Sequence, residues 1–301
     1  MELRILRYFL VVARVQNITR AAEILHITQP TLSRQLMQLE QELGKKLLER
    51  NKGHLELTPY GMRLRRRAEE LVTLADKTEQ EFKGEETDIV GELWIGSGES
   101  EQFHSLSRAM KEFSLRHPLV KFNLFSGNAD DIKEKMANGL IDIALLMEPV
   151  EIDSYDFIRL PDKDRWGILL PIQDPLATHP SITPEDLIGA SLITSQRSLV
   201  HHEIENWFHG LYDTTREIAS VNLIHNAALM VEDGLGYAIT LEHLIEHHAG
   251  TSVCFRPFEP PMETGCVLVW KKHQLFSPVA AAFIQYLEAT YRGKTRTEKV
   301  Q

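Results

Sequence analysis

The stretch Leu25-His26-Ile27-Thr28-Gln29-Pro30-Thr31-Leu32-Ser33-Arg34-Gln35 decides how the first part of this 301-residue chain folds. Thr28 is a good helix N-cap, and Pro30 is tolerated in a first helical turn, where backbone N–H groups have no intrahelical partner in any case. Apolar side chains then recur at the spacing of one helical face, at Leu32, Leu36, Leu39 and Leu43. The stretch therefore predicts an amphipathic helix that begins after Thr28.

A second helix is predicted immediately before this one. Asn17 can cap it, and its apolar face would consist of Ile18, Ala21, Ala22 and Leu25. Two helices joined by a tight turn, the second exposing Gln, Thr, Ser and Arg near its N-terminus, are typical of a helix-turn-helix that reads the DNA major groove. The candidate DNA contacts are Thr28, Gln29, Pro30, Thr31, Ser33 and Arg34. The pattern alone leaves an alternative open, because many three-helix units bind no DNA and have a merely solvated polar face.

A short hairpin is predicted after this recognition helix. Gly44 ends the helix, Asn51-Lys52-Gly53 supplies a turn, and apolar residues alternate on the return strand. We interpret the hairpin as a wing in which Arg50 and Lys52 contact phosphates. Residues 1–58 are therefore expected to form a winged helix-turn-helix DNA-binding domain.

Charge is distributed unevenly along the chain. The net charge is −10, but residues 1–58 hold nine Lys or Arg against six Asp or Glu, a balance of +3, whereas residues 89–301 hold 18 against 29. A locally basic region is what DNA binding requires, even in an acidic protein. No apolar run is long enough to span a membrane, the N-terminus lacks the pattern of a secretory signal, and there are only two cysteines. A cytoplasmic protein is therefore expected.

A long linker helix is predicted over residues 59–88. Thr58 is a good N-cap and Pro59 a good first helical residue. Apolar and small residues then alternate four and three apart, as in a two-chain seam, and their flanks are charged. We therefore prefer a dimer interface to a helix packed on its own domain; its predicted residues are Leu64, Ala68, Leu71, Ala75 and Phe82.

From residue 89 onward, predicted strands and helices alternate, which is typical of an α/β fold with mainly parallel strands. One sheet would need many strands for this length, so two lobes are expected. The chain would cross between them near Pro161-Asp162 and again near Gly265-Cys266. The predicted boundaries are residues 89–161 with 267–301 for lobe I, and residues 162–266 for lobe II.

Six short motifs identify the family that the chain resembles: Arg20-Ala21-Ala22-Glu23, the stretch 25–35 quoted above, Leu39-Glu40, Glu42-Leu43-Gly44, Leu47-Leu48-Glu49-Arg50 and Leu57-Thr58-Pro59-Tyr60-Gly61. Together they resemble the LysR-type transcriptional regulators, densely up to about residue 70 and sparsely beyond. The resemblance implies a C-terminal effector-binding domain of two periplasmic-binding-protein-like α/β lobes. It also implies paired antiparallel linker helices in a homodimer, and a dimer of dimers. The implied partners are double-stranded promoter DNA, a small-molecule effector and, for an activator, RNA polymerase.

The predicted effector site lies at the carboxyl ends of the strands, where helix N-termini offer free N–H groups to ligands of open α/β sheets. The candidate effector contacts at such positions are Ser97, Glu99, Ser100, Asn128, Met147, Ser195 and Asn222. An acidic Glu99 there would disfavour a simple carboxylate effector, unless it were protonated or paired, and favour an amine or hydroxyl groups. A solvent-facing Glu99 outside the cleft is an equally open alternative.

Other chemistry is not indicated by the sequence. It contains no obvious nucleophile–base pair, metal cluster or phosphate loop, so neither an enzyme nor a cofactor or metal is expected. His243 and His247 are four apart but lack further ligands, and Cys254 and Cys266 are interpreted as buried thiols rather than a redox pair. The alternative function is a solute-binding component with a helical extension, against which the missing signal peptide and the wing argue.

Overall fold

The computed structural model describes residues 1–51, 54–81, 89–245 and 252–295, and the chain divides into two compact units, Met1–Lys83 and Gly84–Gln301. The predicted linker helix falls within the N-terminal unit, because it packs on the first helix of the chain.

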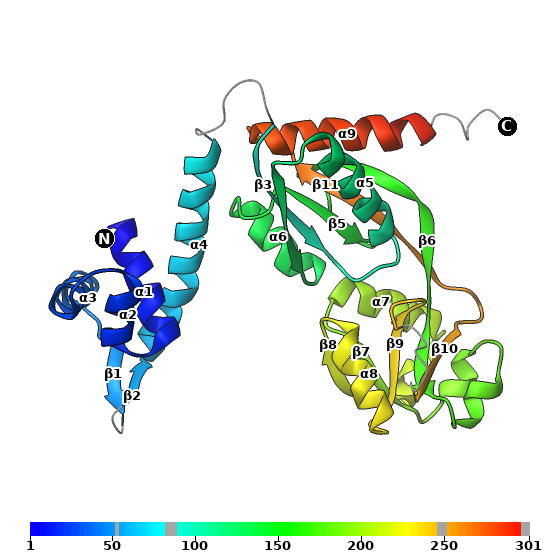
Figure 1. The fold of residues 1–301 in the computed structure, drawn as a ribbon. Helices are drawn as coiled ribbons and strands as arrows, with labels where there is room; N and C mark the ends of the chain where they lie inside the picture. The colour runs from blue at the N-terminus through cyan, green and yellow to red at the C-terminus, as the bar shows by residue number, and fades with distance from the viewer. Residues whose placement is uncertain (52–53, 82–88, 246–251, 296–301) are drawn as a thin grey trace. The chain divides into compact units, whose positions relative to one another are not determined.

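The N-terminal unit contains a helix-turn-helix, a hairpin and a long helix (Figure 1). Its elements are α1 (Leu3–Val15), α2 (Ile18–Ile24), α3 (Gln29–Leu43), β1 (Leu48–Asn51), β2 (His54–Leu57) and α4 (Pro59–Glu81). The Asn17 side chain accepts a hydrogen bond from Arg20 N at 3.0 Å, and the Thr28 side chain accepts one from Thr31 N at 3.4 Å. Both predicted N-caps are therefore formed. α3 ends at Gly44, whose φ of 64° lies in the left-handed region that favours glycine.

The core of this unit is built from the predicted apolar faces. Phe9, Ala21, Leu32 and Leu39 are fully enclosed in it. Ala68 of α4 is also fully buried in this core.

The predicted dimer seam on α4 therefore needs a correction. Ala68 is enclosed within its own unit, and Leu64 packs against the same core, so Ala68 has no surface left for a second chain. The packing occurs because α4 lies along α1. Leu71 and the neighbouring Leu74 are, by contrast, 42% and 41% exposed. Ala75 is half-buried, and Phe82 lies outside the described residues.

The C-terminal unit has two lobes that share two long strands, β6 (Tyr155–Pro171) and β11 (Glu263–Lys271) (Figure 1). The strands of lobe I follow the order β4-β3-β5-β11-β6. α5 and α9 cover one face of this sheet and α6 covers the other. The elements of lobe I are β3 (Gly91–Ser97), α5 (Phe103–Arg116), β4 (Val120–Ser126), α6 (Ala129–Ala137), β5 (Ile143–Met147) and α9 (Pro278–Thr295).

Lobe II continues from the far end of β6 in the order β6-β9-β7-β8, with β10 paired to β6. α7 packs on one face of its sheet and α8 on the other. Its elements are β7 (Ser191–Ser195), α7 (Ser198–Trp207), β8 (Arg216–Val221), α8 (Ile224–Glu232), β9 (Tyr237–Leu241), β10 (Val253–Pro257) and short 3-10 helices at Pro175–Thr178, Pro184–Leu187 and Tyr212–Thr214.

The crossings between the lobes lie within β6 and β11 rather than in loops. Lys163–Arg165 of β6 pair with Glu263–Gly265 of β11 in an antiparallel ladder. The sheets are mixed rather than mainly parallel, because β6 runs antiparallel to β9, β10 and β11, and β11 runs antiparallel to β5. Two paired strands therefore connect the lobes.

Candidate DNA-binding face and effector cleft

The exposed side of α3 carries the candidate DNA contacts. Thr28, Gln29, Pro30, Thr31 and Arg34 are exposed and Ser33 is half-buried. Two hydrogen bonds order this face: Thr28 Oγ1 lies 2.8 Å from Thr31 Oγ1, and Gln29 Nε2 donates to Ser33 Oγ at 2.7 Å. The arrangement presents an amide, hydroxyls and a guanidinium, the groups that read base edges and phosphates.

Glu40 fixes α3 to the wing. Its carboxylate accepts hydrogen bonds from Leu47 N at 2.8 Å, Leu48 N at 3.2 Å and Lys46 Nζ at 2.9 Å. Burial alone would raise the pKa of Glu40, but these three donors together lower it. The hairpin itself pairs from Leu48 with Leu57 to Asn51 with His54. Lys52 lies outside the described residues, and only the backbone of Arg50 is described.

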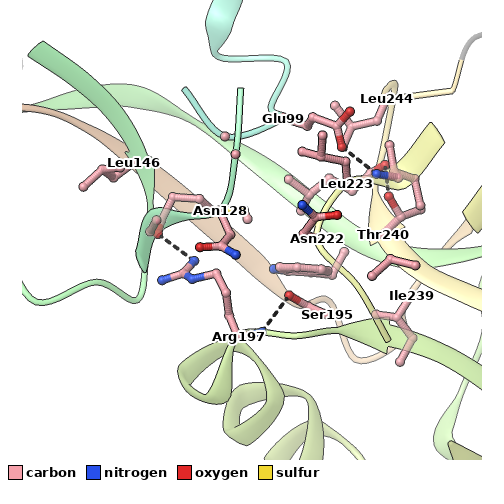
Figure 2. A pocket seen from close by; sticks show the side chains of 18 residues that line it. Glu99, Asn128, Leu146, Ser195, Arg197, Asn222, Leu223, Ile239, Thr240 and Leu244 are labelled. Carbon is pink, nitrogen blue, oxygen red and sulfur yellow. Dashed lines mark hydrogen bonds between the residues drawn. The ribbon is translucent and has the colours of Figure 1, made fainter. Parts of the chain in front are cut away.

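The C-terminal unit has a cleft between its two lobes, lined by residues of both. Five of the seven predicted contacts lie in its wall, which comprises Gly98, Glu99, Gly127, Asn128, Ala129, Leu146 and Met147 from lobe I and Trp166, Ser195, Arg197, Val221, Asn222, Leu223, Ile224, Ile239, Thr240, Leu241 and Leu244 from lobe II. The wall is mostly apolar, with a few polar groups that could orient a ligand (Figure 2).

Ser97 and Ser100 do not line this cleft, which corrects the expectation for them. Both are buried, and Ser97 Oγ donates to the neighbouring Gly98 carbonyl at 2.8 Å. Ser100 Oγ donates to Asp164 Oδ2 at 2.5 Å and lies 3.3 Å from Cys266 Sγ. Ser100 therefore faces the shared strands β6 and β11.

Glu99 lies in the cleft, and the alternative of a solvent-facing side chain outside it is wrong. The side chain is half-buried, and its Oε2 accepts a hydrogen bond from Ile224 N at 2.6 Å. Ile224 is the first residue of α8, so a carboxylate from lobe I occupies the N-terminus of a helix in lobe II (Figure 2). Helix N-termini stabilise negative charge, so this bond connects the two lobes favourably.

Arg197 is the principal cleft residue that sequence reasoning missed. Its guanidinium, from lobe II, donates to Pro149 O at 2.7 Å and Met147 O at 3.3 Å in lobe I. The residue is only 5% exposed, and this burial lowers its pKa although the charge of Asp130 acts in the opposite direction. Its position two residues after the end of β7 and directly before α7 was the available signal. Trp166 and Thr240 were also missed, because nothing local distinguishes them from ordinary strand residues.

Other kinds of site are not indicated in the part of the chain that the structure describes. No group of His, Cys, Asp or Glu there could hold a metal ion, and no helix there is long and apolar enough to cross a membrane. His247, the partner of His243 in the spacing noted above, lies outside the described residues.

Two family models match the chain. Residues 3–62 match the bacterial regulatory helix-turn-helix protein of the lysR family, and residues 87–292 match the LysR substrate binding domain. The chain is 30% identical, over 96% of its length and 97% of the relative's, to the Hca operon transcriptional activator HcaR of Escherichia coli (strain K12). It is 28% identical to the transcriptional regulator BudR of Raoultella terrigena, over 91% of this chain and 96% of that one.

Solved structures have the same fold. CbnR, a LysR family transcriptional regulator, superposes with a TM-score of 0.73 at 21% identity, covering 97% of this chain and 99% of its own. Full-length CbnR complexed with its target DNA superposes with a TM-score of 0.71 at 20% identity, covering 96% of this chain and 100% of that one. HcaR and BudR are both named as transcriptional regulators. The chain therefore belongs to the LysR family of transcriptional regulators, with an N-terminal DNA-binding domain and a C-terminal effector-binding domain.

Proposed function

We propose that this regulator reads promoter DNA through the exposed face of α3 and the wing, and that a small molecule bound between the lobes changes this reading. The observation that carries the proposal is the cleft, whose wall takes residues from both lobes and is bridged by Glu99 and Arg197. A ligand enclosed there contacts both lobes at once, so it favours one lobe arrangement over another.

On the DNA side, we assign base reading to Gln29, Ser33 and Arg34, and phosphate contacts to Thr28, Thr31 and the wing residues Arg50 and Lys52. Pro30 shapes the first turn. The exposure of α3 supports this assignment, and so does the anchoring of the wing by Glu40. Arg bonds guanine and Gln bonds adenine in bidentate fashion, each pair discriminating by about 1–3 kcal/mol.

On the effector side, we assign contacts to Glu99, Asn128, Met147, Ser195, Asn222 and Arg197. The effector can alter DNA binding only by the difference in its affinity for the two lobe arrangements, typically about 1–3 kcal/mol of coupling. The proposed lobe boundaries are those expected above, residues 89–161 with 267–301 and residues 162–266.

We also propose that the active form is a homodimer joined through the exposed side of α4, and a dimer of dimers on longer operators. The exposed Leu71 and Leu74 support the dimer. The protein would act in the cytoplasm, and would contact RNA polymerase if it activates transcription.

The test is to sequence the DNA that the purified protein retains from fragmented genomic DNA, and then to measure binding to a retained fragment. A cleft-filling variant, Asn222→Trp, should bind this fragment with unchanged basal affinity but lose its response to the effector. Asn222 is exposed, so the larger ring is accommodated without disturbing the core. Retention of random sequences, or an unchanged effector response in Asn222→Trp, would contradict the proposal.

A further inference from the structure

The chemistry of the cleft indicates which class of effector it takes. We propose that the effector carries a protonated amine, held by Glu99, on an apolar body, and that Glu99 excludes simple carboxylic acids. This inference rests on the proposed function of the cleft and specifies its ligand.

Glu99 is fixed with one oxygen engaged and the other available. Its Oε2 accepts the Ile224 N–H at 2.6 Å, which holds the carboxylate in the wall of the cleft. Among the hydrogen bonds that the structure gives for the described residues, none involves Oε1. The free oxygen is an acceptor for a ligand N–H, and a bond between an ammonium and a carboxylate is about twice as strong as one between neutral groups.

The wall supplies no cation to pair with Glu99. Among its residues the one basic side chain is Arg197, which Figure 2 shows at the end of the cleft away from Glu99. The Arg197 guanidinium is already engaged by the carbonyls of Met147 and Pro149, and its Nε atom is enclosed without a partner. Among the described residues of the wall, the α8 N-terminus is therefore the one positive group that pairs with the charge of Glu99, and a ligand cation would complete the pairing.

A carboxylate ligand is disfavoured for the same reason. The N-terminus of α8 is an anion site in this wall, and Glu99 already occupies it. At the N-terminus of α6, the Asp130 and Asp131 N–H groups already donate to Asn128 Oδ1. An acid would have to displace Glu99 or lie beside it as a like charge. Arg197 keeps N–H groups beyond the two that bond Met147 and Pro149, but it lies at the end of the cleft away from Glu99, so an acid held there would leave the charge of Glu99 without a cation (Figure 2).

The other side chains of the wall indicate the chemistry of the rest of the ligand. Trp166, Ile239, Leu241 and Leu244 give an apolar surface on lobe II, and Leu146 and Met147 do so on lobe I. Asn222 lies between Glu99 and Arg197 and offers an amide to a hydroxyl or carbonyl (Figure 2). A compact hydrocarbon or aromatic body with one amine fits this distribution of groups.

The experiment compares three probes that share one skeleton: phenethylamine, 2-phenylethanol and phenylacetate. Their binding to the full-length protein is measured by calorimetry at neutral pH, up to about 10 mM, which detects affinities as weak as millimolar. Each is tested on the wild type, on Glu99→Gln, on the matched control Glu101→Gln and on Asn222→Trp. Glu101 carries the same charge two residues away but does not line the cleft. Gln is close to Glu in shape and can still accept the Ile224 N–H, so Glu99→Gln removes mainly the charge.

The wild type and Glu101→Gln should bind the amine at least about tenfold more tightly than the acid. In Glu99→Gln, amine binding should weaken by about tenfold, the acid should gain, and the alcohol should change little. The proposal is overturned if the acid binds the wild type as tightly as the amine, if Glu99→Gln leaves the preference intact, or if none of the probes binds.

Asn222→Trp separates this proposal from the proposed function. Loss of binding in this variant means that the occupied site is the cleft, whichever probe is preferred, so only the ligand class can then fail. Undiminished binding means that the site lies elsewhere, and both the cleft assignment and the ligand class fall.

Discussion

Ser100 Oγ donates a hydrogen bond of 2.5 Å to Asp164 Oδ2, which joins the loop before α5 to the strand that crosses between the lobes. Both side chains are buried, and Gln102 Nε2 lies 3.4 Å from Asp164 Oδ1. Ser100 also accepts from Gln102 N at 3.0 Å. A buried carboxylate is thus held by neutral donors at the crossing of β6.

Asp164 should make stability depend on pH. Burial raises its pKa, the hydrogen bonds from Ser100 and Gln102 lower it, the charge of Glu101 raises it and that of His243 lowers it, and the net direction is upward. The pKa of Asp164 is therefore higher in the native state than in the unfolded state. The protonated Asp164 side chain contributes stability that is present below the unfolded pKa of about 4 and is lost as pH rises through the native pKa.

The check uses Asp164→Asn, which cannot ionise. Its free energy of unfolding should rise relative to that of the wild type as pH increases from about 4 toward neutrality. All four tryptophans lie between residues 94 and 270, so urea unfolding followed by tryptophan fluorescence reports on this unit. The control is Asp162→Asn, at an exposed position two residues away. Its free energy of unfolding should differ from that of the wild type by a nearly constant amount across the same pH range. A constant difference for Asp164→Asn as well would contradict the assignment.

Substitutions at Leu71 and Ala68, three residues apart on α4, should affect different properties of the protein. Leu71→Glu places a charge on an exposed side chain, so it should weaken self-association without lowering the stability of the N-terminal unit. Ala68→Leu overpacks a fully enclosed site, so it should cost about 1–3 kcal/mol of stability. Sedimentation and thermal unfolding separate the two effects, and an unchanged association constant in Leu71→Glu would remove this surface from the dimer interface.

Arg34→Ala should cost about 1–3 kcal/mol of affinity for a retained operator and leave binding to random DNA nearly unchanged. The reason is that Arg34 is exposed on the recognition helix, where its guanidinium can pair with a guanine. Fluorescence anisotropy with both DNAs measures the two affinities. Arg14→Ala, at an exposed position of α1, is the control. Equal losses on both DNAs in Arg34→Ala would identify it as a phosphate contact.

The two thiols should be unreactive in the native protein. Burial raises the pKa of Cys266 to about 12, since the hydrogen bond with Ser100 offsets it only in part, and burial also raises the pKa of Cys254. The thiolate is the reactive form, so a disulfide reagent at pH 8 should label either residue slowly until urea is added. Rapid native labelling that persists in Cys254→Ala would assign a reactive thiol to Cys266 and reopen a redox role.

The sequence by itself determined the local elements of the N-terminal unit and the family. Asn17 and Thr28 act as caps through bonds to residues three positions away, and apolar spacing selects the buried face of a helix whatever lies opposite. Such signals depend on near neighbours in the chain. For the same reason, the expected carboxyl ends of strands include five residues that line the cleft.

Only the tertiary structure decided which side chain of a loop faces the cleft and what each apolar stripe packs against. Glu99 and Ser100 are adjacent in sequence, yet Ile224, 125 positions away, binds one, and Asp164, 64 positions away, binds the other. Ala68 fits the spacing of a dimer seam, yet it is buried in the core that α4 shares with α1. Arg197 bridges the two lobes because its guanidinium donates to two backbone carbonyls of lobe I. These contacts join distant segments through the packing of whole sheets and helices, which local periodicity does not encode.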